Sequence, residues 1–130
     1  YRDLYPFLKD QPKFLFEYGQ CLSKTGQYEE GIRILTEGTR LSADPMFYNI
    51  MGKDAEALKH FGQAEACFKQ ASYMVPHRLY PLYLLAKMYF ESGQPEKGRD
   101  MARQVIQKEP KVMSDAVKEM KAELEERLKP

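Results

Sequence analysis

The chain has 130 residues, enough for one domain, and its hydrophobic content of 43% and charged content of 30% are typical of a folded protein rather than a disordered one. With 20 basic and 19 acidic residues, the net charge of +1 argues against nucleic acid or an anionic membrane as the main partner. No apolar run approaches the roughly 18 residues of a membrane-spanning helix, so no direct membrane insertion is expected. Because the chain begins with Tyr1 rather than methionine, we expect it to be a piece of a longer protein.

The first segment, residues 1–11, is too apolar for a solvated tail, since it carries Leu4, Tyr5, Phe7 and Leu8. Two interpretations remain open from the sequence. The segment is either the remnant of a preceding helical unit or an irregular arm that covers the same surface.

Six helices are predicted between this segment and residue 108. Pro12 suits the first turn of a helix, and Asp44-Pro45 places an N-cap residue before a proline in the first helical position. Gly26 and Gly93 are typical of the left-handed residue that ends a helix. Lys59-His60 occupies the corresponding turn in the middle of the chain, which makes that boundary the least certain. The expected helices span 12–24, 28–41, 45–58, 61–74, 78–91 and 95–108.

Small and large apolar residues recur along these helices with one period. Gly52 and Ala86, Ala64 and Gly98, and Pro76 and Pro110 are each 34 residues apart. Upstream, Gly19 and Gly52, Gly31 and Ala64, and Gly38 and Ala71 are each 33 residues apart. This pattern resembles the tetratricopeptide (TPR) family of helix–turn–helix repeats. The resemblance implies a single all-α TPR domain, a right-handed α-α superhelix of about three repeats. The expected repeats are 12–44, 45–77 and 78–111.

The last segment, 112–130, is predicted to be a capping helix. Ser114 is a plausible N-cap, and Val117, Met120, Leu124 and Leu128 recur at helical spacing with charged residues elsewhere around the helix. A helix of this kind covers the final hydrophobic face of a solenoid. The alternative is a linker helix leading to another domain.

No pattern in the sequence indicates catalysis, a cofactor or a metal. The two histidines, His60 and His77, lie near predicted turns, and neither belongs to a metal-binding or catalytic motif. Cys21 and Cys67 lack the spacing of a metal site or redox pair, so they are expected to be buried or half-buried free thiols. We therefore expect a non-catalytic domain, which leaves binding as the route to function.

The TPR resemblance implies a concave groove lined by the first, or A, helix of each repeat, with a peptide or protein segment as the partner. Lysines beside amide and aromatic groups would suit an acidic peptide or a C-terminal carboxylate. The alternative is that the lysines keep the surface soluble and the aromatic side chains pack on neighbouring helices. The expected groove residues are Lys13, Phe16, Gln20, Asn49, Lys53, Tyr80, Tyr83 and Lys87.

One TPR subclass is disfavoured. Domains that clamp the acidic tails of chaperones carry Lys, Asn and Arg at five groove positions, which this resemblance would place on helices 12–24, 45–58 and 78–91. The residues found there are Phe16, Gln20, Ile50, Tyr80 and Leu84. The dicarboxylate clamp is therefore absent.

A narrower resemblance is to the C-terminal TPR domains attached to bacterial O-antigen ligase or polymerase-like membrane proteins. It rests on the strings FLFEYGQCL (14–22), DPMFYNIMGK (44–53), VPHRLYPLYLLAKMY (75–89) and EPKVMSDAVKEMK (109–121). It implies a bacterial accessory module tethered to the inner membrane through preceding sequence, with no catalytic residue of its own. A third reading is a self-association or scaffold domain that uses its end faces, residues 1–9 or the last helix.

Overall fold

The computed structural model describes residues 1–110 and 113–130, and in these residues it contains eight α-helices and no strands. Residues 111 and 112, which include part of the EPKV string and the expected boundary before the capping helix, lie outside the described residues. The helices are α1 (Tyr5–Leu8), α2 (Pro12–Lys24), α3 (Tyr28–Thr39), α4 (Met46–Ala57), α5 (Phe61–Met74), α6 (Tyr80–Glu91), α7 (Pro95–Gln107) and α8 (Asp115–Leu128).

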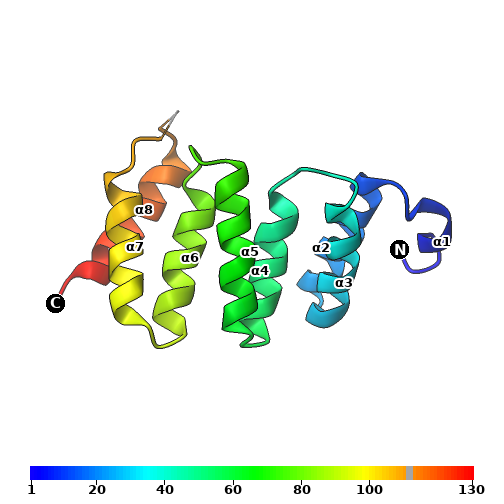
Figure 1. The fold of residues 1–130 in the computed structure, drawn as a ribbon, viewed down its shortest axis with the longest axis horizontal. Coiled ribbons are helices and arrows are strands. Elements are labelled where there is room, and N and C mark those ends of the chain that lie inside the picture. The colour runs from blue at the N-terminus through cyan, green and yellow to red at the C-terminus, as the bar shows by residue number, and fades with distance from the viewer. Residues whose placement is uncertain (111–112) are drawn as a thin grey trace.

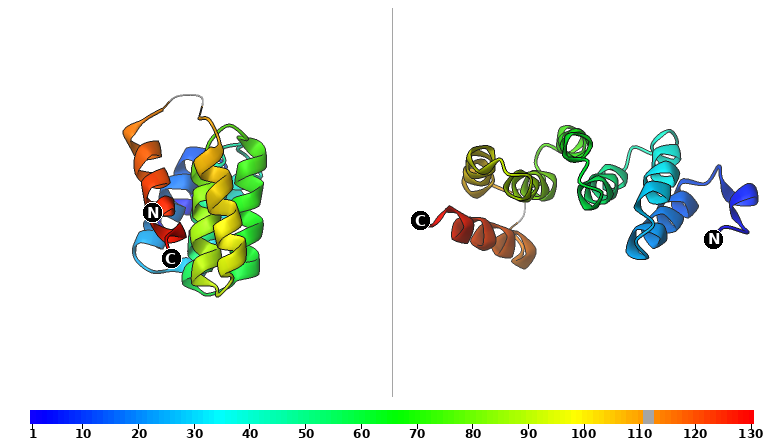
Figure 2. Two further views of the ribbon diagram at one scale, coloured as in Figure 1. Left: turned by 90° about the vertical axis from the view of Figure 1, so that its left-hand side faces the viewer. Right: turned by 90° about the horizontal axis from the view of Figure 1, so that it is seen from below.

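The middle six helices form three antiparallel pairs that stand side by side along the molecule (Figure 1). Seen end-on, α2, α4 and α6 make one layer, and α3, α5 and α7 make the other (Figure 2). The N- and C-termini lie at opposite ends of this array (Figure 1). The all-α superhelical architecture expected from the sequence is confirmed.

Glycines let the two layers approach closely. A Cβ atom added to Gly52 of α4 would lie 2.5 Å from the ring of Phe68 on α5, and one on Gly19 of α2 would lie 2.5 Å from Leu35 on α3. Carbon atoms cannot approach to that distance, so each large side chain occupies the space that the glycine leaves free. The alternation of small and large residues in the sequence therefore specifies the packing of each helix pair.

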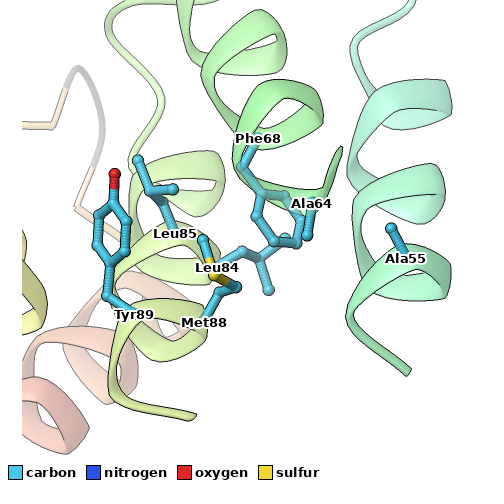
Figure 3. Packing of buried hydrophobic residues seen from close by; sticks show 7 residues of the cluster. All are labelled: Ala55, Ala64, Phe68, Leu84, Leu85, Met88 and Tyr89. Atoms are coloured by element: carbon cyan, nitrogen blue, oxygen red, sulfur yellow. The ribbon is translucent and has the colours of Figure 1, made fainter. Parts of the chain in front are cut away.

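The centre of the core lies between α4, α5 and α6. Phe68 is fully buried on α5, and the residues around it come from all three helices (Figure 3). The cluster comprises Ala55, Ala64, Phe68, Leu84, Leu85, Met88 and Tyr89. Because the middle pair contacts neighbours on both sides, it is the part of the array that loses most if its packing is disturbed.

The helix ends follow the local signals in the sequence. The Asp44 carboxylate accepts a hydrogen bond of 2.9 Å from the backbone N–H of Met46, and the Ser114 hydroxyl accepts one of 3.2 Å from Val117. Ser114 is the N-cap of α8, as expected, whereas the N-cap of α4 is Pro45, so Asp44 lies one residue earlier than the sequence predicted. Both side chains nevertheless satisfy backbone donors that the first turn of a helix leaves unpaired. Helices α2 to α7 begin and end within two residues of the predicted bounds.

Helix α4 ends with a left-handed residue, as α2 and α6 do at Gly26 and Gly93. Lys59 has a φ of +62°, close to the values of +81° for Gly26 and +76° for Gly93. The His60 N–H donates to the Ala55 carbonyl over 2.8 Å, which is the backbone hydrogen bond of a Schellman C-cap. The left-handed position expected after each A helix is therefore present here, but a lysine occupies it.

Replacing Lys59 with glycine is expected to stabilise the protein by about 1 kcal/mol, because a residue with a Cβ is strained at this φ and glycine is not. Thermal or urea unfolding of Lys59→Gly would show the gain. As a control, Lys69→Gly in the interior of α5 should lose about 1 kcal/mol. Equal destabilisation by both substitutions would contradict the assignment of strain to Lys59.

The first residues form an arm with a single helical turn, α1, laid against the outer face of α2. The Tyr1 ring stacks on Tyr18 with 5.8 Å between centroids, and the Tyr5 hydroxyl donates a hydrogen bond to Glu37 on α3. Leu4 and Phe7 of the same arm face solvent, with 51% and 81% of their surface exposed. Aromatic side chains, rather than a full helix, thus cover this end of the array.

Helix α8 lies on the side of the array formed by the A helices, beside α6 and α7 (Figure 2). Its Leu124 is fully buried in a cluster with Val105 of α7, and Val117, Met120 and Leu128 pack around it. The Lys121 amine donates to the carbonyls of Ile106 and Lys108, over 3.0 and 2.8 Å, where α7 ends. The amphipathic pattern of residues 117–128 therefore covers the last helix pair, as a capping helix does.

Candidate functional site: the face of the A helices

The eight groove residues expected from the sequence come from α2, α4 and α6, which form one layer. They differ in how much of their side chain is exposed to solvent. Lys13 and Lys53 are exposed, and Gln20 is half-buried. The half-buried Phe16 packs edge-on against Phe47, with 5.2 Å between ring centroids, so part of its surface belongs to the α2–α4 contact.

A pocket of about 540 Å³ lies between α4, α6 and α8. Three of the expected residues, Asn49, Tyr80 and Tyr83, line it together. The other walls are mostly apolar, and α8 supplies one of them. The remaining lining residues are Pro45, Met46, Val75, Arg78, Pro81, Ala116, Glu119, Met120 and Glu123.

Asn49 is the buried polar residue among those that line this pocket. Only 2% of its surface is exposed, and its Oδ1 atom accepts no hydrogen bond from the described residues. Its Nδ2 atom faces the Met46 sulfur at 3.5 Å. A buried polar atom without a partner costs free energy of about 1–3 kcal/mol, so such atoms are rare in folded proteins. The Oδ1 atom is itself enclosed, so its missing partner is a cost to the fold rather than an acceptor exposed in the pocket.

Tyr83 and Lys87 on α6 already bind a carboxylate from α8. The Tyr83 hydroxyl donates to Glu123 Oε2 over 2.7 Å, and the Lys87 amine lies 3.3 Å from the same oxygen. Partial burial alone would lower the pKa of Lys87, but the hydrogen bond to Tyr83 and the charge of Glu123 outweigh it and raise that pKa. Two of the expected groove residues are thus occupied by the capping helix.

A second pocket, of about 250 Å³, lies between α4 and α6 and brings Lys53 and Lys87 together with Glu56 and Glu91. Burial, then the hydrogen bond and negative charge of Glu91, raise the pKa of Glu56 to about 8. The lysines expected to attract an acidic ligand are therefore close to acidic side chains of the protein itself. The charge of this surface is mixed rather than basic.

A third pocket, of about 320 Å³, lies between α2 and α4, where Gln20 and Lys53 are joined by Lys24 and Asp54. Asp54 is 2% exposed, and its carboxylate accepts a hydrogen bond of 2.7 Å from Ser23. Burial raises the pKa of Asp54 to about 6, against the lowering effect of Ser23 and Lys53. A Cβ on Gly31 would lie 3.0 Å from this carboxylate, so the glycine leaves room for the pair.

Sequence reasoning did not find the contribution of α8 to this face. The TPR resemblance assigns groove positions only to the A helices of the three repeats. Glu119, Met120 and Glu123 belong to α8, which follows those repeats. The amphipathic spacing of residues 117–128 predicts which side of α8 packs against the core. It carries no information on which A helix the remaining sides approach.

Three other properties bear on function. No group of three or more His, Cys, Asp or Glu residues in the described part of the chain could hold a metal ion. None of the described helices is long and apolar enough to cross a membrane. Cys67 is buried and Cys21 half-buried, both as free thiols, as the sequence predicted.

Comparison with protein families decides the repeat type. The family described as tetratricopeptide repeat matches residues 12–45 and, through a second model of the same description, residues 82–111. The chain contains tetratricopeptide repeats. No curated protein matches the sequence. The narrower resemblance to domains attached to O-antigen ligases is therefore supported by the four sequence strings alone.

Several solved structures have a similar fold. The crystal structure of MamA has a TM-score of 0.75 and 15% identity, with 98% of this chain and 84% of that chain covered. The first TPR of Spaghetti (RPAP3), bound to the HSP90 peptide SRMEEVD, has a TM-score of 0.72 and 19% identity, covering 91% and 95%. PcrH, in complex with the chaperone binding region of PopB, has a TM-score of 0.71 and 15% identity, covering 92% and 95%. At these identities the likeness concerns the fold.

Proposed function

We propose that this TPR domain binds a peptide or protein segment on the face of its A helices. The observation that carries the proposal is the 540 Å³ pocket between α4, α6 and α8, whose mostly apolar walls include Asn49, Tyr80 and Tyr83. Two proteins of the same fold are described with bound segments, the HSP90 peptide and the PopB region. Pockets that are largely apolar, with a few placed polar groups, are typical binding sites.

The lysines near α2, which lie outside the pocket that Lys53 shares with Glu56 and Glu91, would favour an acidic residue in the segment. Lys13 and Lys53 are exposed, and Lys24 lies beside Gln20 and Lys53 in the α2–α4 pocket. Lys87 contributes less than the sequence suggested, because Glu123 already pairs with it. An acidic side chain or C-terminal carboxylate of the ligand would therefore lie over α2 and α4, where amide and ammonium donors are available. Without the dicarboxylate clamp, its binding would differ from that of chaperone tails.

The proposal is tested with peptides selected on the immobilised full chain from a random 12-residue library. The double variant Gln20→Ala/Lys53→Ala should weaken the selected peptides by about tenfold, the loss typical of removing an interface hot spot. Fluorescence anisotropy would measure the dissociation constants.

Gln104→Ala/Lys97→Ala, on the exposed surface of α7, is the matched control, since it removes the same amide and charge from the opposite layer. It should leave binding unchanged. Peptides that lose affinity with the α7 control, or that bind both double variants as tightly as wild type, would place the site elsewhere.

A second candidate is an accessory domain of a membrane glycan enzyme resembling an O-antigen ligase or polymerase. The four strings quoted above, which extend over much of the chain, support it. Such a domain would position a partner or the assembly and leave catalysis to other segments. Determining the gene sequence that precedes Tyr1 tests this candidate. A run of membrane spans there would support it, and another soluble domain would contradict it.

Self-association is a third candidate, favoured by the exposed Leu4 and Phe7 at the N-terminal end. Light scattering between about 5 and 500 μM would test it. A concentration-dependent mass that Phe7→Ser abolishes would support it. A constant monomer mass would rule it out.

A further inference from the structure

We propose that Glu123 on α8 is an internal competitor, which occupies the site on α6 where Tyr83 and Lys87 would otherwise bind an acidic residue of a partner. The inference rests on the proposed function and adds an autoinhibitory contact to it. A partner would have to displace this carboxylate before its own acidic side chain could bind at the third repeat.

The contact between Glu123 and α6 has the geometry of a bound carboxylate. The Tyr83 hydroxyl donates to Glu123 Oε2 over 2.7 Å, and the Lys87 amine lies 3.3 Å from the same oxygen. The Lys87 amine also donates to the Tyr83 hydroxyl over 3.2 Å, which holds the two groups together. Tyr83 and Lys87 are four residues apart, so they lie on one side of α6. A hydroxyl and an ammonium group that converge on one oxygen can bind a carboxylate from any chain.

Helix α8 follows this side of α6 for about two turns (Figure 2). Near the end of α6, the Arg127 guanidinium lies 4.6 Å from the centroid of the Phe90 ring, a cation–π contact. Glu123 and Arg127 are four residues apart and therefore project from one side of α8. Helix α8 thus covers the part of α6 that the sequence expects to bind a partner.

Glu123 is held loosely, whereas the helix that carries it is held firmly. The side chains of Lys87 and Glu123 are 40% and 46% exposed, and an ion pair so open to water contributes little to stability. The adjacent Leu124 is fully buried, and Lys121 donates to two carbonyls at the end of α7. The Glu123 side chain can therefore rotate into solvent while α8 stays on α7.

Displacing Glu123 leaves a site with an excess of positive charge. Lys53 and Lys87 line the α4–α6 pocket together with Glu56 and Glu91. Burial and the neighbouring Glu91 raise the pKa of Glu56 to about 8, so Glu56 is mostly protonated at pH 7 and neutralises neither lysine. One remaining carboxyl group, that of Glu91, cannot balance two lysines. An acidic side chain of a partner would restore the charge that Glu123 supplies.

Glu123→Ala should open this site to an acidic probe. The probe is tetraglutamate with an acetylated N-terminus and an amidated C-terminus, added to the whole chain, and NMR signals of the Tyr83 ring and the Lys87 ε-methylene group report its binding. If Glu123 occupies the site for about nine-tenths of the time, its removal lowers the dissociation constant of the probe about tenfold. An unchanged dissociation constant, or shifts confined to other parts of the chain, would overturn the inference.

Two further variants separate competition from a change in net charge. Glu125→Ala removes the same charge from an exposed position on α8 and should bind the probe as wild type does. Lys87→Ala, added to Glu123→Ala, should abolish the gain. The methyl signals of Leu124 and Val105 should be the same in Glu123→Ala as in wild type, because α8 keeps its contact with α7. An equal gain in Glu125→Ala, or release of α8 from α7, would overturn the inference.

The tetraglutamate probe reports on α6 and not on the α2–α4 side of the face. A gain at Tyr83 and Lys87, with no selected peptide held at Gln20 and Lys53, would refute the proposed groove and leave the competition by Glu123 standing. Selected peptides that depend on Gln20 and Lys53, with no gain at α6, would refute the competition alone.

Discussion

Phe68→Ala should lower the free energy of unfolding by about 3–5 kcal/mol, the usual cost of removing a phenylalanine from a core. Phe68 is fully buried between α4, α5 and α6, and Gly52 stands against its ring. The neighbouring helices cannot move together to fill the space, because other contacts hold each of them. Urea denaturation followed by circular dichroism would measure the loss.

Tyr73 on the same helix provides the control, since 70% of its surface is exposed. Tyr73→Ala should change stability by no more than about 0.5 kcal/mol. A loss below about 1 kcal/mol for Phe68→Ala would show that the middle helix pair is not the best-packed part of the array.

Ionisation of Asp54 should make the protein less stable as the pH rises from about 4 to about 6. An aspartate in the unfolded chain has a pKa of about 3.9, whereas burial raises the pKa of Asp54 to about 6 in the folded chain. Between these values the folded protein keeps a proton that the unfolded chain has released, so stability falls with rising pH. Two pH units correspond to about 3 kcal/mol.

Asp54→Asn isolates this effect from other groups, including Glu56, whose pKa is also raised. The amide oxygen can still accept from Ser23 and carries no charge. The variant should exceed wild type in stability by about 1–3 kcal/mol at pH 8, and the advantage should disappear near pH 4. Asp100→Asn, on the exposed surface of α7, should show no such dependence. Parallel pH profiles for wild type and Asp54→Asn would mean that Asp54 does not titrate in this range.

The sequence was sufficient to predict the fold because each local signal agreed with its neighbours. Glycine, alanine and large apolar residues recur with the repeat period, and Ser114 and Gly26 act at the helix ends that they predict. Even the turn at Lys59, which lacks the expected glycine, adopts the same backbone conformation. The hydrogen bonds and packing of the repeat determine its shape, and the lysine tolerates the strain.

The site was less predictable, because contacts across the repeats are not periodic. The repeat pattern assigned Asn49, Tyr80 and Tyr83 to the A helices, and in the structure these three residues line one pocket. It gave no indication that Glu123 would hold Tyr83 and Lys87, or that Phe16 would pack against Phe47. These contacts depend on how α8 crosses α6 and on side-chain rotamers, which a single sequence does not specify.

The substantial contacts of α2 to α8 join each helix to those one or two places away in the chain. Such local contacts give a low contact order, so only short loops must close for the native pairs to form. Folding can then begin at any helix pair and extend to its neighbours, with the central pair favoured because it gains two interfaces. Pulling on the two ends would accordingly release the array pair by pair from its margins, and the pocket beside α8 would be lost in an early step.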